Sequence, residues 1–174
     1  YGGDLYVGAM TIIYSVREVV QMPMQGFTQG AQPVLGYNYG AGENGRVKEG
    51  IRFIRRVTLL YAVVLWAVLI LFPQTIVRLF NKEAELLEVS VISMRWHFAL
   101  FFFMAFQYVG QTVFVSLGKA KQAVFFSLFR KAILGVPLIL ILPRLWGLGI
   151  YGVLAAEPVT NIVGGLACYF TMMA

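Results

Sequence analysis

Residues 18 to 41 read EVVQMPMQGFTQGAQPVLGYNYGA, a stretch long enough to cross a bilayer, with five regularly spaced polar side chains. In a helix of about 3.6 residues per turn, these side chains share an arc of roughly 80°. They are Glu18, Gln21, Gln25, Gln29 and Gln32. The residues between them are mostly apolar. The pattern predicts a membrane helix with one polar stripe, as in the wall of a cavity.

Pro23 lies within this stripe. A proline removes one backbone donor and clashes with the preceding helical turn. Inside a membrane this is tolerated where packed protein or a cavity satisfies the freed carbonyl. We therefore expect Pro23 to be a hinge of the helix, next to the cavity.

The composition is that of a membrane protein. Hydrophobic residues make up 59% of the 174 residues and charged residues 13%, whereas an ordinary soluble domain has about 25% charged residues. We expect an all-α integral membrane protein in contact with lipid. The net charge of +6 does not indicate a nucleic-acid partner, because the charges lie mainly at the ends of apolar segments.

Five transmembrane helices are predicted from the apolar runs. Their approximate ranges are 5–38, 51–72, 91–117, 122–143 and 150–174. The loops are short, and the one at 74–90 is rich in glutamate. Basic residues gather instead at 40–56 and 118–121, so both of these loops are expected to be cytoplasmic.

Three strings resemble the multidrug and toxic compound extrusion (MATE) family of transporters. Residues 26–52, GFTQGAQPVLGYNYGAGENGRVKEGIR, resemble the family's G-x-x-Q-G-x-Q-P segment and the basic turn after it. Residues 116–143, SLGKAKQAVFFSLFRKAILGVPLILILP, and residues 147–165, GLGIYGVLAAEPVTNIVGG, look like the family's last two helices. The strings occur in family order along nearly the whole chain.

This resemblance implies two six-helix lobes around a central cavity. The five helices would be helices eight to twelve, so that residues 1–174 form a partial C-terminal lobe. A missing N-terminal lobe of the same protein would be the partner, in the cell (inner) membrane. The implied activity is secondary active efflux of amphipathic or cationic drugs and toxic compounds, by antiport coupled to Na⁺ or H⁺.

No enzyme motif or nucleotide site is present in the sequence, and no cofactor is expected. Uphill transport would then depend on an ion gradient. One alternative is a flippase for lipid-linked oligosaccharides or lipids of the same superfamily, with a more basic cavity. A further one, from a different class, is a membrane-embedded enzyme or a structural subunit. His97 is the only histidine and Cys168 the only cysteine, so no metal site is predicted.

Further polar side chains are candidates for the cavity wall. Gln107 and Gln111 lie deep in the third predicted span, and Glu157 and Asn161 lie in the last one. Gln107 stands close to where one branch of the family places a coupling carboxylate, so the resemblance does not carry ion coupling over to this helix. If the chain follows the other branch, the coupling acid is on the missing lobe.

Each of these groups also has a structural interpretation. The glutamines could bind substrate through their amides, or they could hold helices together by hydrogen bonds. Glu157 could line the cavity or form a structural ion pair. Arg130 and Lys131 match a basic position of the family, and we expect them to reach the headgroups or a helix end near the cytoplasmic face.

Overall fold

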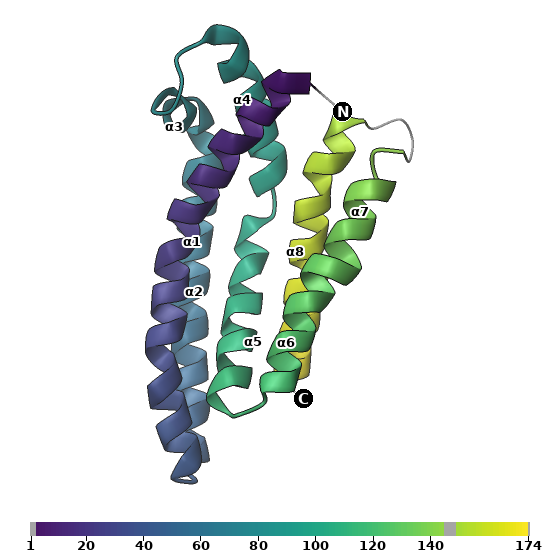
Figure 1. Cartoon of the computed structure of the whole chain (residues 1–174). Coiled ribbons are helices and arrows are strands. Elements are labelled where there is room, and N and C mark those ends of the chain that lie inside the picture. The colour runs from purple at the N-terminus through teal and green to yellow at the C-terminus, as the bar shows by residue number, and fades with distance from the viewer. Residues whose placement is uncertain (1–2, 145–148, 174) are drawn as a thin grey trace.

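The computed structural model describes residues 3–144 and 149–173, and these form a bundle of antiparallel helices without a strand (Figure 1). The α-helices are α1 (Gly3–Gly40), α2 (Asn44–Leu71), α3 (Pro73–Arg78), α4 (Ala84–Phe98), α5 (Met104–Ser116), α6 (Ala120–Leu128), α7 (Val136–Ile141) and α8 (Ile150–Met173). A 3₁₀ turn, η1 (Phe101–Phe103), precedes α5, and a π-helical segment, η2 (Phe129–Gly135), joins α6 to α7.

Three helical stretches are long and apolar enough to cross a membrane within the described residues: Asn44–Leu71, Ala120–Ile141 and Ile150–Met173. The pair Ala84–Phe98 and Phe101–Ser116, bent by 40°, would be a fourth span. At 38 residues α1 has ample length, but its polar stripe gives it a less apolar composition. The predicted all-α membrane architecture is confirmed.

Several helix bounds differ from the prediction. Helix α2 begins at Asn44 instead of residue 51, so most of the basic turn is helical. The glutamate-rich stretch at 74–90 contains α3 and the first turns of α4. Residues 145–148 and Ala174, within the last predicted loop and at the end of the last predicted helix, lie outside the described residues.

The third predicted span is broken between α4 and η1 instead of continuous. The chain turns at Ala99 and Leu100, and this releases backbone carbonyls from the helical ladder. The indole Nε1 of Trp66 on α2 donates a hydrogen bond of 2.7 Å to the Ala99 carbonyl. A side chain from a neighbouring helix therefore satisfies a carbonyl at the break, as a membrane interior requires.

The fourth span also departs from a regular α-helix. Pro137 has no backbone N–H with which to continue the ladder, and the seven residues of η2 that precede it are π-helical. Such π-helical segments are frequent at functional sites. Here the segment contains Arg130 and Lys131.

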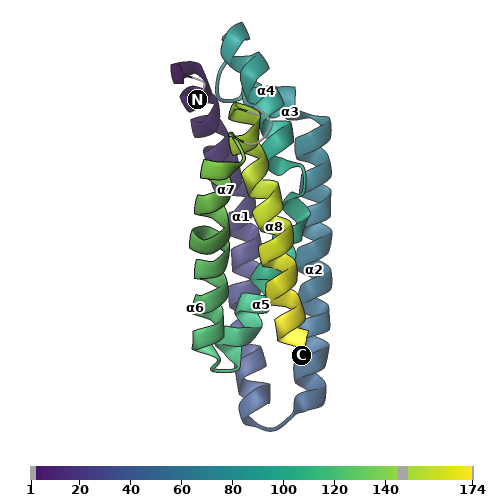
Figure 2. The same cartoon turned by 90° about the vertical axis from the view of Figure 1, so that its right-hand side faces the viewer.

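Helices α1, α2, α4 and α5 pack around an apolar core that includes Ile13, Met24, Met94 and Phe98, all fully buried. Helix α8 packs along α5, and η2 lies against α8 (Figure 2). The turns at 40–44 and 117–119 lie at the same end of the bundle, as expected for two loops on one side of a membrane (Figure 1).

Candidate functional site

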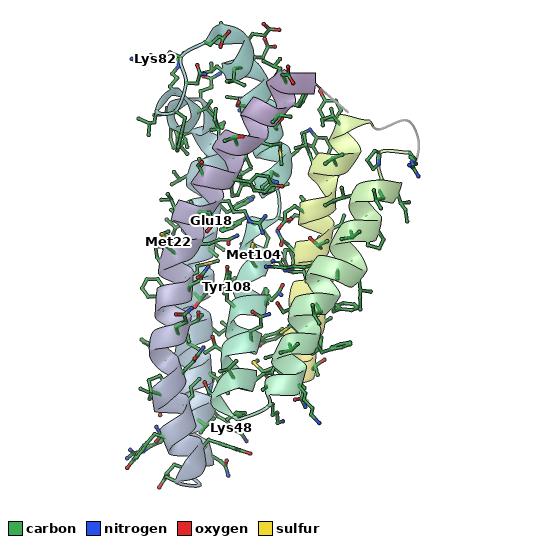
Figure 3. The ribbon with its side chains drawn as sticks, in the orientation of Figure 1. Glu18, Met22, Lys48, Lys82, Met104 and Tyr108 are labelled. Carbon is green, nitrogen blue, oxygen red and sulfur yellow. The ribbon has the colours of Figure 1, made fainter. Side chains whose placement is uncertain are left out.

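A polar cavity of about 540 Å³ opens between α1, α5, η2 and α8. Its wall includes six of the residues that the sequence marked as candidates: Glu18, Gln21, Gln25, Gln107, Gln111 and Glu157. The labelled side chains of Glu18, Met104 and Tyr108, which belong to this wall, lie at mid-height of the bundle between α1 and α5 (Figure 3). The fold therefore gathers polar groups from three predicted spans at membrane depth.

The rest of the stripe lines a second, smaller cavity of about 200 Å³. Gln29 and Gln32 belong to this cavity and not to the larger one. Three side chains line both cavities: Gln25, Tyr108 and Gln111. The polar stripe of α1 therefore lines two neighbouring cavities that share part of their wall.

The carboxylate of Glu157 on α8 connects three segments of the bundle. Its Oε1 lies 2.8 Å from Nη2 of Arg17 on α1 and 3.2 Å from Nη1 of Arg130 on η2. Both guanidinium groups therefore share one carboxylate oxygen. Arg17 and Glu157 both line the cavity, so their ion pair joins α1 to α8 across it. Helix α5 lies between these two helices in the bundle (Figure 1).

Asn161 does not line either cavity. It lies one turn along α8 from Glu157, is 1% exposed, and its Oδ1 accepts a hydrogen bond of 3.0 Å from Nη1 of Arg130. The same guanidinium nitrogen thus contacts the amide and the carboxylate. Asn161 supports the arginine from behind the wall, so the expectation that it lines the cavity is corrected to this role.

Arg130 is in the interior and not at the headgroups as the sequence-based interpretation expected. Only 8% of its surface is exposed, and its ion pair with Glu157 replaces the solvation that snorkelling would provide. A glycine makes this position possible: a Cβ at Gly164 on α8 would lie 2.8 Å from Cγ of Arg130. Lys131 is exposed, and it also lines the cavity.

Two glutamines of the stripe are hydrogen-bonded to α5. The hydroxyl of Tyr108 donates to Oε1 of Gln21 at 3.1 Å and accepts from Nε2 of Gln25 at 3.4 Å. Nε2 of Gln21 also lies 3.5 Å from the sulfur of Met104. These amides both line the cavity and hold α1 to α5, so the structural interpretation applies to Gln21 and Gln25, and substrate binding by the stripe stays a prediction.

Arg17 and Tyr108 are site residues that sequence reasoning missed. Arg17 is adjacent to Glu18 in the sequence and was not assigned to the wall. The predicted spans hold three cations, Arg17, Arg130 and Lys131, within reach of two carboxylates, Glu18 and Glu157. This excess of cations over carboxylates is the signal that could have found it. Tyr108 had no signal, because a tyrosine in an apolar run is common.

Pro23 lies inside α1, which runs through both Pro23 and Pro33 as one helix from Gly3 to Gly40. The structure is of a single conformation, so the hinge stays a prediction. Pro23 itself is half-buried and lines neither cavity.

The MatE family model matches residues 1–141. Among curated proteins, the chain is similar to an FAD transporter of Shewanella oneidensis, with 26% identity over 168 residues. That match covers 94% of this chain and 35% of the relative. The chain thus spans little more than a third of the length of this relative.

Solved structures share the fold. The MATE multidrug transporter DinF-BH, in complex with rhodamine 6G, is 34% identical, with a TM-score of 0.85 over 99% of this chain and 38% of that one. An outward-facing multidrug resistance MATE transporter has a TM-score of 0.92 at 17% identity, and an inward-facing one a TM-score of 0.86 at 16% identity. These two cover 99% and 97% of this chain, and 39% and 38% of theirs.

Proposed function

Because the chain belongs to the MatE family, we propose that it forms most of the C-terminal lobe of a transporter that exports amphipathic small molecules by alternating access. The observation that carries this proposal is the polar cavity between α1, α5, η2 and α8, at the depth of the membrane. The N-terminal lobe of the same protein would supply the opposite wall. The 40–56 and 118–121 loops would then be cytoplasmic, in the cell membrane.

The energy for export would come from antiport with Na⁺ or H⁺. Of the two carboxylates in the cavity wall, Glu157 already balances two arginines, and Gln107 cannot titrate. The coupling acid would then be Glu18 or a carboxylate of the N-terminal lobe. Pro23 would allow α1 to bend as the lobes alternate, because its missing hydrogen bond weakens the helix at that point.

Transport by reconstituted vesicles tests this proposal. The full-length transporter would be placed in proteoliposomes with a fluorescent amphipathic dye, and dye movement would be followed after a Na⁺ or H⁺ gradient is imposed. We expect dye movement that depends on one of the two gradients. Gln25→Leu, in the wall of both cavities, should reduce the initial rate about tenfold.

Gln122→Leu is the matched control, because Gln122 is exposed on α6 and lines neither of these cavities. It should leave the rate unchanged. Gradient-independent dye movement, or equal rates for Gln25→Leu and the wild type, would contradict the proposal.

A second candidate substrate is a flavin dinucleotide, which the similarity to an FAD transporter favours. Its charged diphosphate would need cations in the wall, and Arg17, Arg130 and Lys131 provide them. The same vesicles, loaded with FAD, distinguish this candidate, since FAD release would accompany the gradient. The sequence-based expectation of cationic substrates has no such support from the charges of this wall.

A further inference from the structure

The sign of the charge on the cavity wall bears on the class of substrate, beyond the single flavin candidate. Among the described lining residues, three are cations, Arg17, Arg130 and Lys131, and two are carboxylates, Glu18 and Glu157. One net positive charge is left. The other polar groups of the wall are amides and hydroxyls, which are dipoles that can present either a donor or an acceptor.

The excess positive charge is concentrated at the centre of the network. Both arginines contact the same oxygen, Oε1 of Glu157, at 2.8 and 3.2 Å. Neither arginine has another carboxylate within 4 Å among the described residues. One carboxylate therefore balances two guanidinium groups, and one positive charge has no counter-charge within 4 Å among residues 3–144 and 149–173.

The donors of Arg130 are only partly used. Its Nη1 donates to Glu157 and Asn161, while Nη2 has no hydrogen-bond partner in the described part of the chain. The side chain of Arg17 is 16% exposed and lies in the cavity wall. Guanidinium groups with spare N–H donors bind carboxylate, sulfonate and phosphate groups well, because their planar donors match the paired oxygens.

We infer that this cavity binds the anionic group of an amphipathic organic anion, with Arg17, Arg130 and Lys131 as its counter-charges. The inference rests on the proposed transport function and names its substrate class. Glu18 places a negative charge in the wall of the same cavity and opposes anion binding. Aromatic or apolar parts of the ligand would lie against Tyr14, Met104 and Ile139, which also line the cavity.

Two xanthene dyes of opposite charge test the inference, because they share one ring system. Fluorescein is anionic near pH 8, whereas rhodamine 6G, the ligand in the DinF-BH complex, is cationic. Fluorescence anisotropy would measure the binding of each dye to the full-length transporter in detergent. We expect fluorescein to bind at least about fivefold more tightly, as one unscreened charge in a partly wetted cavity provides.

Two exposed residues of the wall are the matched pair of variants. Lys131→Gln removes a positive charge and should weaken fluorescein binding about threefold while it strengthens rhodamine 6G binding. Glu18→Gln removes a negative charge and should do the reverse. Neither side chain has an ion pair within the described residues, so neither change breaks the bundle.

Arg17→Gln tests the centre of the network. It leaves the Arg130–Glu157 pair in place and removes the uncompensated charge, so fluorescein affinity should fall about tenfold. Size-exclusion chromatography of each variant confirms that it is folded.

Rhodamine 6G binding as tight as fluorescein binding, or Lys131→Gln and Glu18→Gln shifting fluorescein affinity in the same direction, would overturn the inference. Its failure is distinct from that of the proposed function. If fluorescein binds more tightly than rhodamine 6G but no gradient moves either dye in vesicles, the transport proposal fails and the anion site stands. If a gradient moves rhodamine 6G and fluorescein does not bind, transport stands and the anion site fails.

Discussion

Replacing Glu157 by glutamine should destabilise the bundle more than any other single charge removal in the cavity. Oε1 of Glu157 forms ion pairs with Arg17 and Arg130 at 2.8 and 3.2 Å, and it accepts a hydrogen bond from Nη1 of Arg130. The side chains of Arg17 and Arg130 are 16% and 9% exposed. Glu157→Gln keeps the shape and an acceptor oxygen but leaves both arginines without a counter-charge.

The size of the effect follows from these contacts. A charge-assisted hydrogen bond contributes about 1.5–3 kcal/mol, and a neutral one about 1 kcal/mol. Breaking a buried ion pair by removing one partner costs about 3–5 kcal/mol. Because 22% of the Glu157 side chain is exposed, solvent screens part of this cost, and we expect a loss of about 3 kcal/mol in the free energy of unfolding.

Unfolding of the full-length transporter in mixed micelles, with a rising mole fraction of SDS, would measure the loss by tryptophan fluorescence. Glu18→Gln is the matched control, because Glu18 is an exposed carboxylate of the same cavity with no ion pair in the described structure. It should change the free energy by less than about 0.5 kcal/mol.

A double variant separates the ion pair from the loss of packing. Arg130→Gln combined with Glu157→Gln leaves one charge uncompensated instead of two, so it should be more stable than Glu157→Gln alone. The reasoning is refuted if Glu157→Gln is as stable as the wild type, or if the loss in free energy of unfolding of the double variant equals the sum of the losses of Arg130→Gln and Glu157→Gln.

Two packing predictions concern glycine and tryptophan. Gly164→Ala should lower the free energy of unfolding by about 1–3 kcal/mol, because its Cβ would lie 2.8 Å from an arginine side-chain carbon. Gly26→Ala is the control and should be neutral or stabilising, because no atom lies within 4 Å of the added Cβ. The same SDS titration compares the two variants. Trp66→Phe should cost about 1–3 kcal/mol, because the Ala99 carbonyl loses its donor at 2.7 Å. Trp96→Phe, with its side chain half exposed and no hydrogen bond in the described structure, is the control, and equal thermal midpoints of the two tryptophan variants would contradict the role of the indole.

Much of the fold could be predicted from local composition. Apolar length determines where helices can cross a bilayer, because no backbone polar group can be left unpaired in lipid. The 3.6-residue period placed the glutamines of α1 on one face, and the rarity of polar groups in spans singled out Gln107, Gln111 and Glu157, which line the same cavity. The helix ends were less accurate, because residues such as Asn44 can extend a helix into the headgroup region at little cost.

The breaks in the spans could not be predicted in the same way. The interruption at Ala99 depends on Trp66 of another helix, which supplies the missing donor. The buried position of Arg130 depends on Gly164 and Glu157 of α8. Each is a contact between residues far apart in the chain, and no local pattern contains both members.

The sequence by itself determined that this chain is a helical membrane protein with a polar stripe on its first helix, because length, apolarity and periodicity are local properties. Tertiary structure alone decided which charges meet. Arg17, Arg130 and Glu157 come from three different segments, and only their packing brings two guanidinium groups to one carboxylate oxygen. The net positive charge of the cavity wall, and with it the sign of the ligand that we infer, follows from that packing.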